Sequence, residues 1–279
     1  MKKILNSMLP KVYGAYFNAL ALISAKKAAK KSFQLFCTPR KGRVLPKQED
    51  FLNRAKDGII KAEGISYQTY RWPGKKDTVL LIHGWESNSF RWRNLISFLR
   101  DEDFDVIALD APAHGYSTSQ IFNVPIHVKG VHKIVEKYNP KHVVAHSIGG
   151  MTALYHQHKY PDLGVEKIVA LGSPSEFSII VKSYRDFLGL NQKVMTAMKA
   201  YFYNLFGFHV HEFSTAKFSE KISIKGLLIH DELDRITPIA GSEKVHASWK
   251  NSTLVKTKGF GHSLHQDAVS EKVIDFLKS

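Results

Sequence analysis

The chain has 279 residues, of which 44% are hydrophobic and 23% are charged, and its formal net charge is +15. This composition excludes a disordered, a collagen-like or a coiled-coil protein. The single cysteine, Cys37, excludes an intramolecular disulfide, and no group of Cys and His residues has the spacing of a structural zinc site.

The positive charge is concentrated at the N-terminal end. Residues 1–48 contain eleven Lys and Arg residues and no Asp or Glu, whereas the rest of the chain carries 29 basic and 25 acidic side chains. We therefore expect a basic helical arm over residues 1–58, attached to a nearly neutral body. Nucleic acid is a poor candidate partner, because a nucleic-acid-binding domain carries its basic stripe on its folded body.

The arm contains a helical pattern with one apolar face. Its longest apolar run, Val12–Ala25, is shorter than the roughly 20 residues that cross a bilayer, and polar residues interrupt it. Apolar residues at positions 12, 15, 16, 19, 20 and 23 share a face. We favour docking of this face on the protein's own core; the alternative is contact of residues 1–48 with an anionic membrane. A secretory signal fits this segment less well, because Lys11 adjoins its apolar run. We therefore expect a cytoplasmic protein, which would be membrane-peripheral if residues 1–48 contact a membrane.

From about residue 59, short β-branched runs alternate with longer helical patterns. The expected strands are Ile65–Arg71, Thr78–Ile82, Asp105–Leu109, His142–Ala145, Lys167–Leu171, Lys225–Ile229 and Thr253–Lys256. The expected helices are Phe90–Arg100, Val128–Tyr138, Ile148–Tyr160, Ile239–Lys250 and Leu264–Leu277. Continuously apolar strands are buried on both faces, so we predict an α/β fold over residues 59–279, with a mostly parallel sheet between two layers of helices.

One interval between strands is too long for a simple crossover. Residues 175–220 lie before the penultimate expected strand and are rich in Phe, Tyr and Met. We predict that this insertion is a helical cap over a pocket, because long insertions in compact domains are more often functional than idle. The alternative is a small helical subdomain that buries only its own apolar face.

A serine follows the strand at residues 142–145 directly. The segment Ala145–Gly150 reads AHSIGG, with Ser147 where a buried strand passes into a helix. Small residues two positions to either side allow the strand and helix to approach closely. This segment resembles the nucleophile elbow of the α/β-hydrolase superfamily, G-x-S-x-G, with Ala145 in place of the first glycine. The resemblance implies that Ser147 is the catalytic nucleophile.

Two further segments carry the resemblance. The sequence His83-Gly84-Trp85 follows the strand that ends at Ile82 and resembles the family's HG-x loop. The resemblance implies that the backbone N–H groups of Trp85 and Ile148 form an oxyanion hole, and that His83 is structural. The segment Asp110–Ser117 resembles the family's D-x-P-x-H-G-x-S segment, which shapes the pocket wall without taking part in catalysis.

The acid and the base of a catalytic triad are the remaining parts. The segment His230–Pro238 resembles the family pattern H-G-x-x-D-x-x-x-P, which implies Asp234 as the orienting acid and leaves Asp231 and Glu232 as solvated loop charges. The segment Gly259–Ser263 lies where the family carries its catalytic histidine, which implies His262. Ser147, Asp234 and His262 have the chain order of this fold. The neighbouring His146 is expected to point into the fold, and His265 to lie on the final helix.

The resemblance covers roughly residues 78 to 277 and implies a serine hydrolase that forms an acyl-enzyme without a cofactor or metal. The expected substrate is a small-molecule carboxylic ester or thioester, with an apolar acyl group suggested by the aromatic insertion. An aspartate nucleophile would be needed for a haloalkane dehalogenase or epoxide hydrolase, which argues against both. A carbon–carbon hydrolase, a cofactor-free haloperoxidase, an acyltransferase and a catalytically silent binding module stay open as alternatives.

Overall fold

The computed structural model describes residues 2–279, with side chains from residue 8 onward, so the side chains of Lys2 and Lys3 in the predicted arm lie outside the described residues. The chain divides into two compact units. One contains Met1–Thr38 and Glu176–Ser214, and the other contains Pro39–Ser175 and Thr215–Ser279. The predicted boundary at residue 58 differs from this division, in which residues 39–58 belong to the larger unit and residues 2–38 belong with the insertion.

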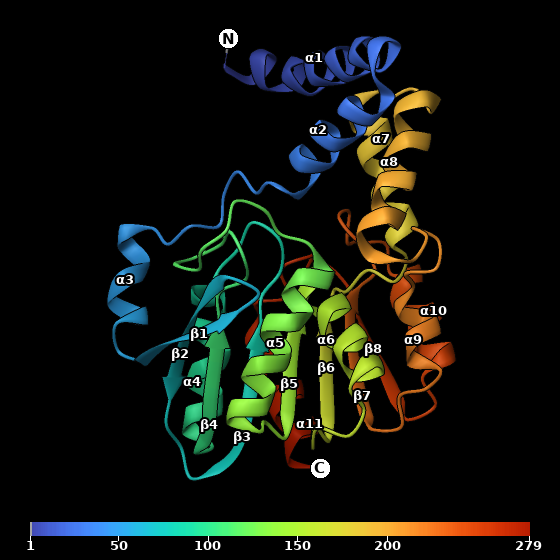
Figure 1. Ribbon diagram of the computed structural model, residues 1–279. Coiled ribbons are helices and arrows are strands. Elements are labelled where there is room, and N and C mark those ends of the chain that lie inside the picture. Colours follow the sequence, from blue (N-terminus) through green and yellow to red (C-terminus); the bar gives the residue numbers. More distant parts are fainter. Residues whose placement is uncertain (1) are drawn as a thin grey trace. The chain divides into compact units, whose positions relative to one another are not determined.

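The larger unit is built on an eight-stranded sheet (Figure 1). Its strand order is β1-β2-β4-β3-β5-β6-β7-β8, and the pairs β1–β2 and β2–β4 are antiparallel while all others are parallel. The strands are β1 (Lys56–Ala62), β2 (Ile65–Trp72), β3 (Lys76–Ile82), β4 (Phe104–Leu109), β5 (His142–His146), β6 (Lys167–Leu171), β7 (Lys225–Asp231) and β8 (Ser252–Thr257). The predicted α/β fold with a mostly parallel sheet is confirmed.

Helices cover both faces of this sheet. They are α3 (Pro46–Leu52), the 3₁₀ helix η1 (Ser89–Trp92), α4 (Arg93–Asp101), α5 (Val124–Tyr138), α6 (Ile148–Lys159), α9 (Thr215–Ser219), α10 (Ala240–Ser248) and α11 (Asp267–Lys278). The prediction that His265 lies on the last helix is wrong, since α11 begins at Asp267. Sequence analysis also missed β1, whose polar ends and Gly58 weaken the apolar pattern of a strand.

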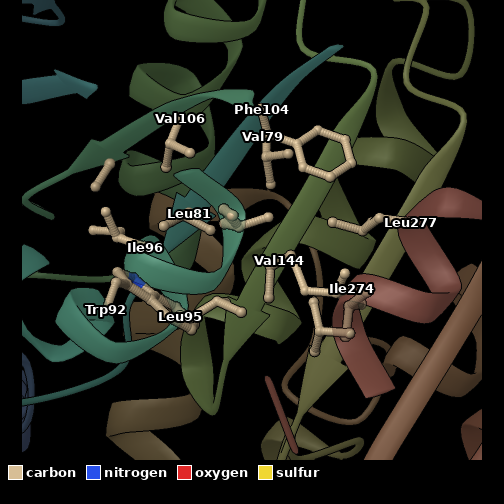
Figure 2. Packing of buried hydrophobic residues seen from close by; sticks show 14 of the residues in the cluster. Val79, Leu81, Trp92, Leu95, Ile96, Phe104, Val106, Val144, Ile274 and Leu277 are labelled. Atoms are coloured by element: carbon tan, nitrogen blue, oxygen red, sulfur yellow. The ribbon is translucent and has the colours of Figure 1, made fainter. Parts of the chain in front are cut away.

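Alternate side chains of each central strand pack into two separate hydrophobic clusters. On β3, Val79 and Leu81 face one cluster, which η1, α4 and α11 complete, and Figure 2 shows this packing. Leu80 and Ile82 face the other cluster, which α5, α6 and α10 complete. All four side chains are fully buried. Because successive side chains of a strand point to opposite faces, a continuous apolar run requires this three-layer arrangement.

The smaller unit is a group of helices. It contains α1 (Lys2–Ile23), α2 (Ala25–Cys37), α7 (Phe177–Leu188) and α8 (Gln192–Phe206), the last two from the insertion between β6 and β7. Phe33 of α2 packs edge to face on Tyr201 of α8, and Phe36 packs on Tyr184 of α7. The insertion therefore buries its aromatic face together with the first 38 residues. That it caps a pocket stays a prediction.

The contact between α1 and α7 includes a close backbone approach at Gly14. Pro10, Gly14, Phe17 and Ala21 form the buried stripe of α1, and a Cβ atom on Gly14 would collide with the carbonyl of Leu188. The face at 12, 15, 16, 19, 20 and 23, expected to dock on the core, is mostly exposed instead. The expectation is wrong because the side of α1 that is buried is the one on which Gly14 allows the backbone of α7 to approach closely, and hydrophobic periodicity does not report that approach.

Candidate active site

Ser147 stands at the junction between β5 and α6 in a strained backbone conformation. Its φ and ψ angles are 54° and −127°, which few residues other than glycine adopt. The N–H of Ser147 donates to the carbonyl of Leu171 over 2.8 Å, and its own carbonyl accepts from Gly150 over 2.9 Å. These bonds hold the serine at the tip of the turn. Ala145 fits in place of a glycine because it lies in β5 with no positive φ and is fully buried.

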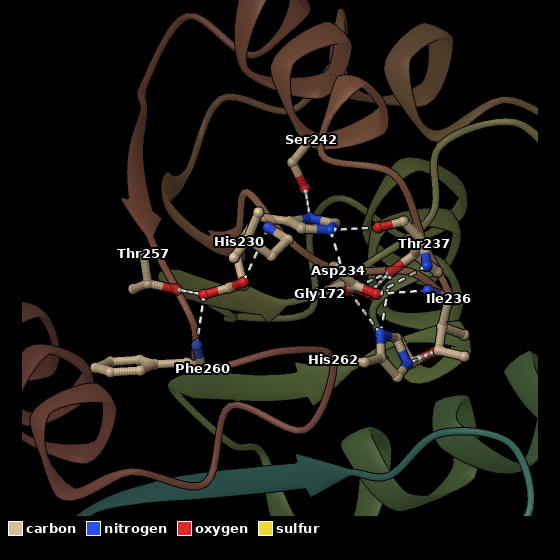
Figure 3. Close-up of polar contacts among 12 residues, drawn as sticks. Gly172, His230, Asp234, Ile236, Thr237, Ser242, Thr257, Phe260 and His262 are labelled. Atoms are coloured by element: carbon tan, nitrogen blue, oxygen red, sulfur yellow. Dashed lines mark hydrogen bonds and ion pairs between the residues drawn. The ribbon is translucent and has the colours of Figure 1, made fainter.

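Three side chains from distant parts of the chain meet at this turn. Nε2 of His262 lies 3.1 Å from Oγ of Ser147. Nδ1 of the same imidazole donates to Oδ2 of Asp234 over 2.7 Å (Figure 3). Asp234 follows β7, and His262 lies between β8 and α11. The structure thus brings together Ser147, His262 and Asp234, the three residues predicted to form a triad. This arrangement allows the serine hydroxyl to transfer its proton to the imidazole.

Hydrogen bonds keep Asp234 ionised. Burial would raise the pKa of this carboxyl, but the bond from His262 and the bonds from Thr237 and Ile236 outweigh burial and hold the pKa below its usual value. Oδ1 accepts from the backbone N–H groups of Ile236 and Thr237 over 2.8 and 3.0 Å. A carboxylate held in this way can orient the imidazole and stabilise its protonated form.

Thr237 and His230 were not predicted as site residues. Oγ1 of Thr237 lies 2.8 Å from Oδ2 of Asp234, 3.1 Å from Nδ1 of His262 and 3.0 Å from the carbonyl of Gly172. His230 is fully buried; its Nε2 lies 2.8 Å from the Thr237 carbonyl, and its Nδ1 lies 2.7 Å from Oγ of Ser242. Both residues belong to the segment His230–Pro238, which also contains Asp234. Their sequence positions do not show that they face the Asp234 carboxylate; the folded loop places them there.

The expectation that Asp231 is a solvated loop charge is wrong. Its side chain is fully buried and accepts hydrogen bonds from the backbone of Leu233 and Phe260 and from the hydroxyl of Thr257, over 3.0, 2.8 and 2.9 Å. Burial raises its pKa, but these bonds lower the pKa by more. Asp231 therefore ties the end of β7 to the loop that carries the site histidine. Glu232, in contrast, is exposed as expected.

Two histidines beside the site do not reach Ser147. The ring of His146 is buried, and its Nε2 donates to the carbonyl of His262 over 2.8 Å. Burial, with the nearby charge of Arg91, holds its pKa well below the usual value, so the ring stays neutral. Nη2 of Arg91 donates to the carbonyl of Ser263 over 2.9 Å. Two buried side chains thus hold the carbonyl groups of the successive residues His262 and Ser263. The pKa of His265 is lowered by burial to about 4.

The two segments with the predicted oxyanion-hole N–H groups flank Ser147. Ile148 is the first residue of α6, so its N–H has no partner within that helix. A Cβ atom on Gly84 would meet the side chain of Ser147, which places the loop before Trp85 directly against the serine. His83 is structural as expected: it is buried, Nδ1 donates to the Gly84 carbonyl over 2.7 Å, and Nε2 accepts from the N–H of Ala111 over 2.9 Å.

The segment Asp110–Ser117 braces the same region. The fully buried carboxylate of Asp110 accepts hydrogen bonds from Ser89, Tyr70 and the backbone of Tyr116. All of its partners are structural groups of the fold, in agreement with a non-catalytic role. Among the residues with described side chains, no group of three or more His, Cys, Asp or Glu is placed to hold a metal ion.

Known proteins share this fold and, in part, this sequence. Residues 77–209 match the family described as "alpha/beta hydrolase fold", and residues 211–279 match the family described as "TAP-like protein". The chain is 28% identical over 269 residues to the uncharacterized hydrolase YugF of Bacillus subtilis, which covers 80% of this chain and 96% of the relative. It is 25% identical over 276 residues to the bifunctional esterase/perhydrolase DCH of Acinetobacter calcoaceticus, which covers 79% and 99%.

A solved structure supports the fold alone. An esterase from Exiguobacterium antarcticum superposes with a TM-score of 0.63 at 17% identity, covering 80% of this chain and 100% of that structure. The sheet topology, the two family matches in succession and the hydrolase relatives agree with one another. The chain belongs to the α/β-hydrolase superfamily.

Proposed function

We propose that this protein is a serine hydrolase that cleaves carboxylic esters or thioesters through an acyl-enzyme. The observation that carries the proposal is the continuous relay from Asp234 through His262 to Ser147, with hydrogen-bond distances of 2.7 and 3.1 Å. The name of one relative, the bifunctional esterase/perhydrolase of Acinetobacter calcoaceticus, agrees with this reaction class.

Each step of the proposed reaction assigns a role to one of these groups. Oγ of Ser147 attacks the carbonyl carbon of the ester while its proton passes to Nε2 of His262. Asp234 keeps Nδ1 protonated, so that Nε2 is free to accept this proton. The tetrahedral oxyanion lies against the N–H groups of Ile148 and Trp85, and the imidazolium then protonates the leaving alcohol or thiol. Water attacks the acyl-enzyme by the same relay and releases the acid.

The surface beside the proposed oxyanion hole favours an apolar acyl group. The ring of Trp85 is 37% exposed and packs edge to face on Phe122 and His114. Burial lowers the pKa of His114 to about 4, so this neighbour is neutral at pH 7. An aliphatic or aromatic acyl chain would gain from contact with the exposed ring of Trp85, whereas a charged acyl group would lose hydration there.

A fluorophosphonate probe tests the nucleophile directly. We expect the probe to label the wild-type protein on the peptide that contains Ser147, and Ser147→Ala to abolish labelling and lower turnover of short p-nitrophenyl esters by at least about 10³-fold. Ser183→Ala, at an exposed serine of α7, is the matched control and should label like the wild type.

Two results would contradict this proposal. Esterase activity unchanged in Ser147→Ala would mean that another group is the nucleophile. A folded wild-type protein that neither labels nor turns over any ester of a C2 to C16 chain-length series would point to the binding module instead. Circular dichroism of each variant establishes that loss of activity is not loss of folding.

A further inference from the structure

Most of the large apolar side chains of helix α1 are exposed. Its buried stripe is narrow and consists of Pro10, Gly14, Phe17 and Ala21. The exposed fractions of large apolar side chains on the remaining surface reach 60% at Met8 and Val12, 75% at Leu22 and 88% at Ile23. The other large exposed residues are Leu9, Tyr13 and Tyr16. A water-exposed helix normally presents charged and polar residues on this side, so the pattern is inverted.

The same helix carries very little charge over its described side chains. Lys11 is the one charged residue between positions 8 and 23, and its Nζ donates to the backbone carbonyl of Asp186 in α7. The polar side chain of Asn18 also forms hydrogen bonds within this unit. Its Nδ2 donates to the carbonyl of Gly189, and its Oδ1 accepts from the backbone N–H of Asn191. The exposed face is therefore left to apolar and aromatic side chains.

A cluster of positive charge follows immediately. Four exposed lysines lie on the first two turns of α2, at Lys26, Lys27, Lys30 and Lys31. Within the described part of the chain none of them forms an ion pair, and residues 1–48 contain no acidic side chain. The buried side of α2 holds Ala28, Ala29 and Phe33, which directs the lysines outward.

We infer that α1 lies in the surface of an anionic phospholipid membrane, with its exposed apolar face among the acyl chains and the α2 lysines on the lipid phosphates. Among the described residues no helix is long and apolar enough to span a bilayer. A helix with one exposed apolar face beside a cluster of lysines binds parallel to the membrane surface. Tyr13 and Tyr16 have the apolar ring and polar hydroxyl that suit the depth of the headgroups.

Charge decides between a lipid surface and a second copy of the chain. Two copies joined through this face would bring together two identical lysine clusters with no acidic residues from the same segment to offset them. An anionic membrane supplies both partners at once, an apolar interior for the α1 face and negative phosphates for the lysines. This inference does not depend on the proposed catalytic triad.

An environment-sensitive label on the full chain tests the inference. Cys37 is buried and its thiol pKa is raised by burial to about 12, so a cysteine introduced as Leu22→Cys is the reactive one. We expect a nitrobenzoxadiazole dye at this position to shift to the blue and brighten on vesicles of phosphatidylcholine and phosphatidylglycerol, and much less on phosphatidylcholine alone. The same dye at Lys250→Cys, exposed in the larger unit, should not respond.

Two sets of substitutions separate the apolar and the charged contributions. Val12→Ser with Leu22→Ser and Ile23→Ser should weaken vesicle binding at least about tenfold. Charge reversal of the four α2 lysines to Glu should weaken it by on the order of a hundredfold or more. The matched control reverses four exposed lysines of the larger unit that form no ion pair among the described residues, namely Lys244, Lys250, Lys258 and Lys272, and should keep most of the binding.

Three outcomes would overturn the inference. The first is no dye response on any vesicle. The second is equal binding to neutral and anionic vesicles that charge reversal leaves unchanged, which would remove the role of the lysines. The third is a blue shift without vesicles that grows with protein concentration, which would assign the face to a second copy of the chain.

Discussion

At the scale of single residues, the role of the Thr237 hydroxyl in the candidate site could not be predicted from the residue type. It lies within 3.1 Å of both Asp234 and His262 and bonds the carbonyl of Gly172. We expect Thr237→Val to lower kcat on p-nitrophenyl esters roughly tenfold with little change in KM, because a bond to a charged group is lost while the backbone bonds to Asp234 remain. Thr237→Ser should restore most of the rate.

The comparison with Asp234 makes this positioning role testable. Asp234→Asn should lower kcat by on the order of 10³- to 10⁴-fold, since an amide cannot hold the imidazole in the tautomer that accepts the serine proton. Stopped ester assays over a range of substrate concentrations measure both parameters. If Thr237→Val lost as much activity as Asp234→Asn, the hydroxyl would be indispensable to the relay rather than a support for the carboxylate.

At the scale of elements, the packing of α1 on α7 depends on Gly14. A Cβ atom there would collide with the backbone carbonyl of Leu188, which cannot turn aside as a flexible side chain can. Alanine favours a helix over glycine, yet we expect Gly14→Ala to lower the free energy of unfolding of this unit by about 1–3 kcal/mol, because the helices must separate. Urea unfolding followed by far-ultraviolet circular dichroism measures the change.

The neighbouring position provides the control for this packing. Ala15 is exposed, so Ala15→Leu adds bulk one residue away without a backbone collision and should leave the urea midpoint nearly unchanged. A Gly14→Ala variant as stable as the wild type, or more stable, would show that α1 does not pack as closely as the structure has it.

At the scale of the whole molecule, buried histidines set the stability at acid pH. Burial lowers the pKa of His83 and His114 to about 4 and that of His156 to about 3. In the unfolded chain these histidines have an ordinary pKa near 6.5. Between about pH 6.5 and 4 the unfolded chain therefore binds more protons than the folded protein, in which the buried rings stay neutral. Stability is therefore greatest above pH 6.5 and falls as the pH drops through this window, by about 1 kcal/mol per such histidine at pH 5.5.

Urea midpoints at pH 7.5 and 5.5 check this dependence. We expect a clearly lower midpoint at pH 5.5, and a smaller difference in His156→Leu, which removes one buried imidazole whose Nε2 has no partner among the described atoms. A midpoint that stays constant between the two pH values would mean that these rings are protonated or hydrated in the folded state.

Local patterns explain why much of the fold and the core of the site could be predicted. The parallel strands β3 to β7 each contain a continuous apolar run, whereas the edge strand β8 holds only Leu254 and Val255 as apolar residues. The residues assigned to the triad each follow the end of a parallel strand. Because the carboxyl ends of parallel strands share one edge of a sheet, chain order alone brings Ser147, Asp234 and His262 to the same edge. Helix ends were less predictable, as the late start of α11 shows.

The remaining features depend on contacts between segments that are distant in sequence. The chain by itself determined a mostly parallel sheet, a serine at a strand-to-helix turn and a basic N-terminal segment. Only the tertiary structure decided that Asp231 is buried under the His262 loop, that Thr237 supports Asp234, and that the first 38 residues fold with the insertion. The physical reason is that periodicity reports how apolar a helix face or loop is, whereas burial depends on which surface another segment can approach closely enough to cover.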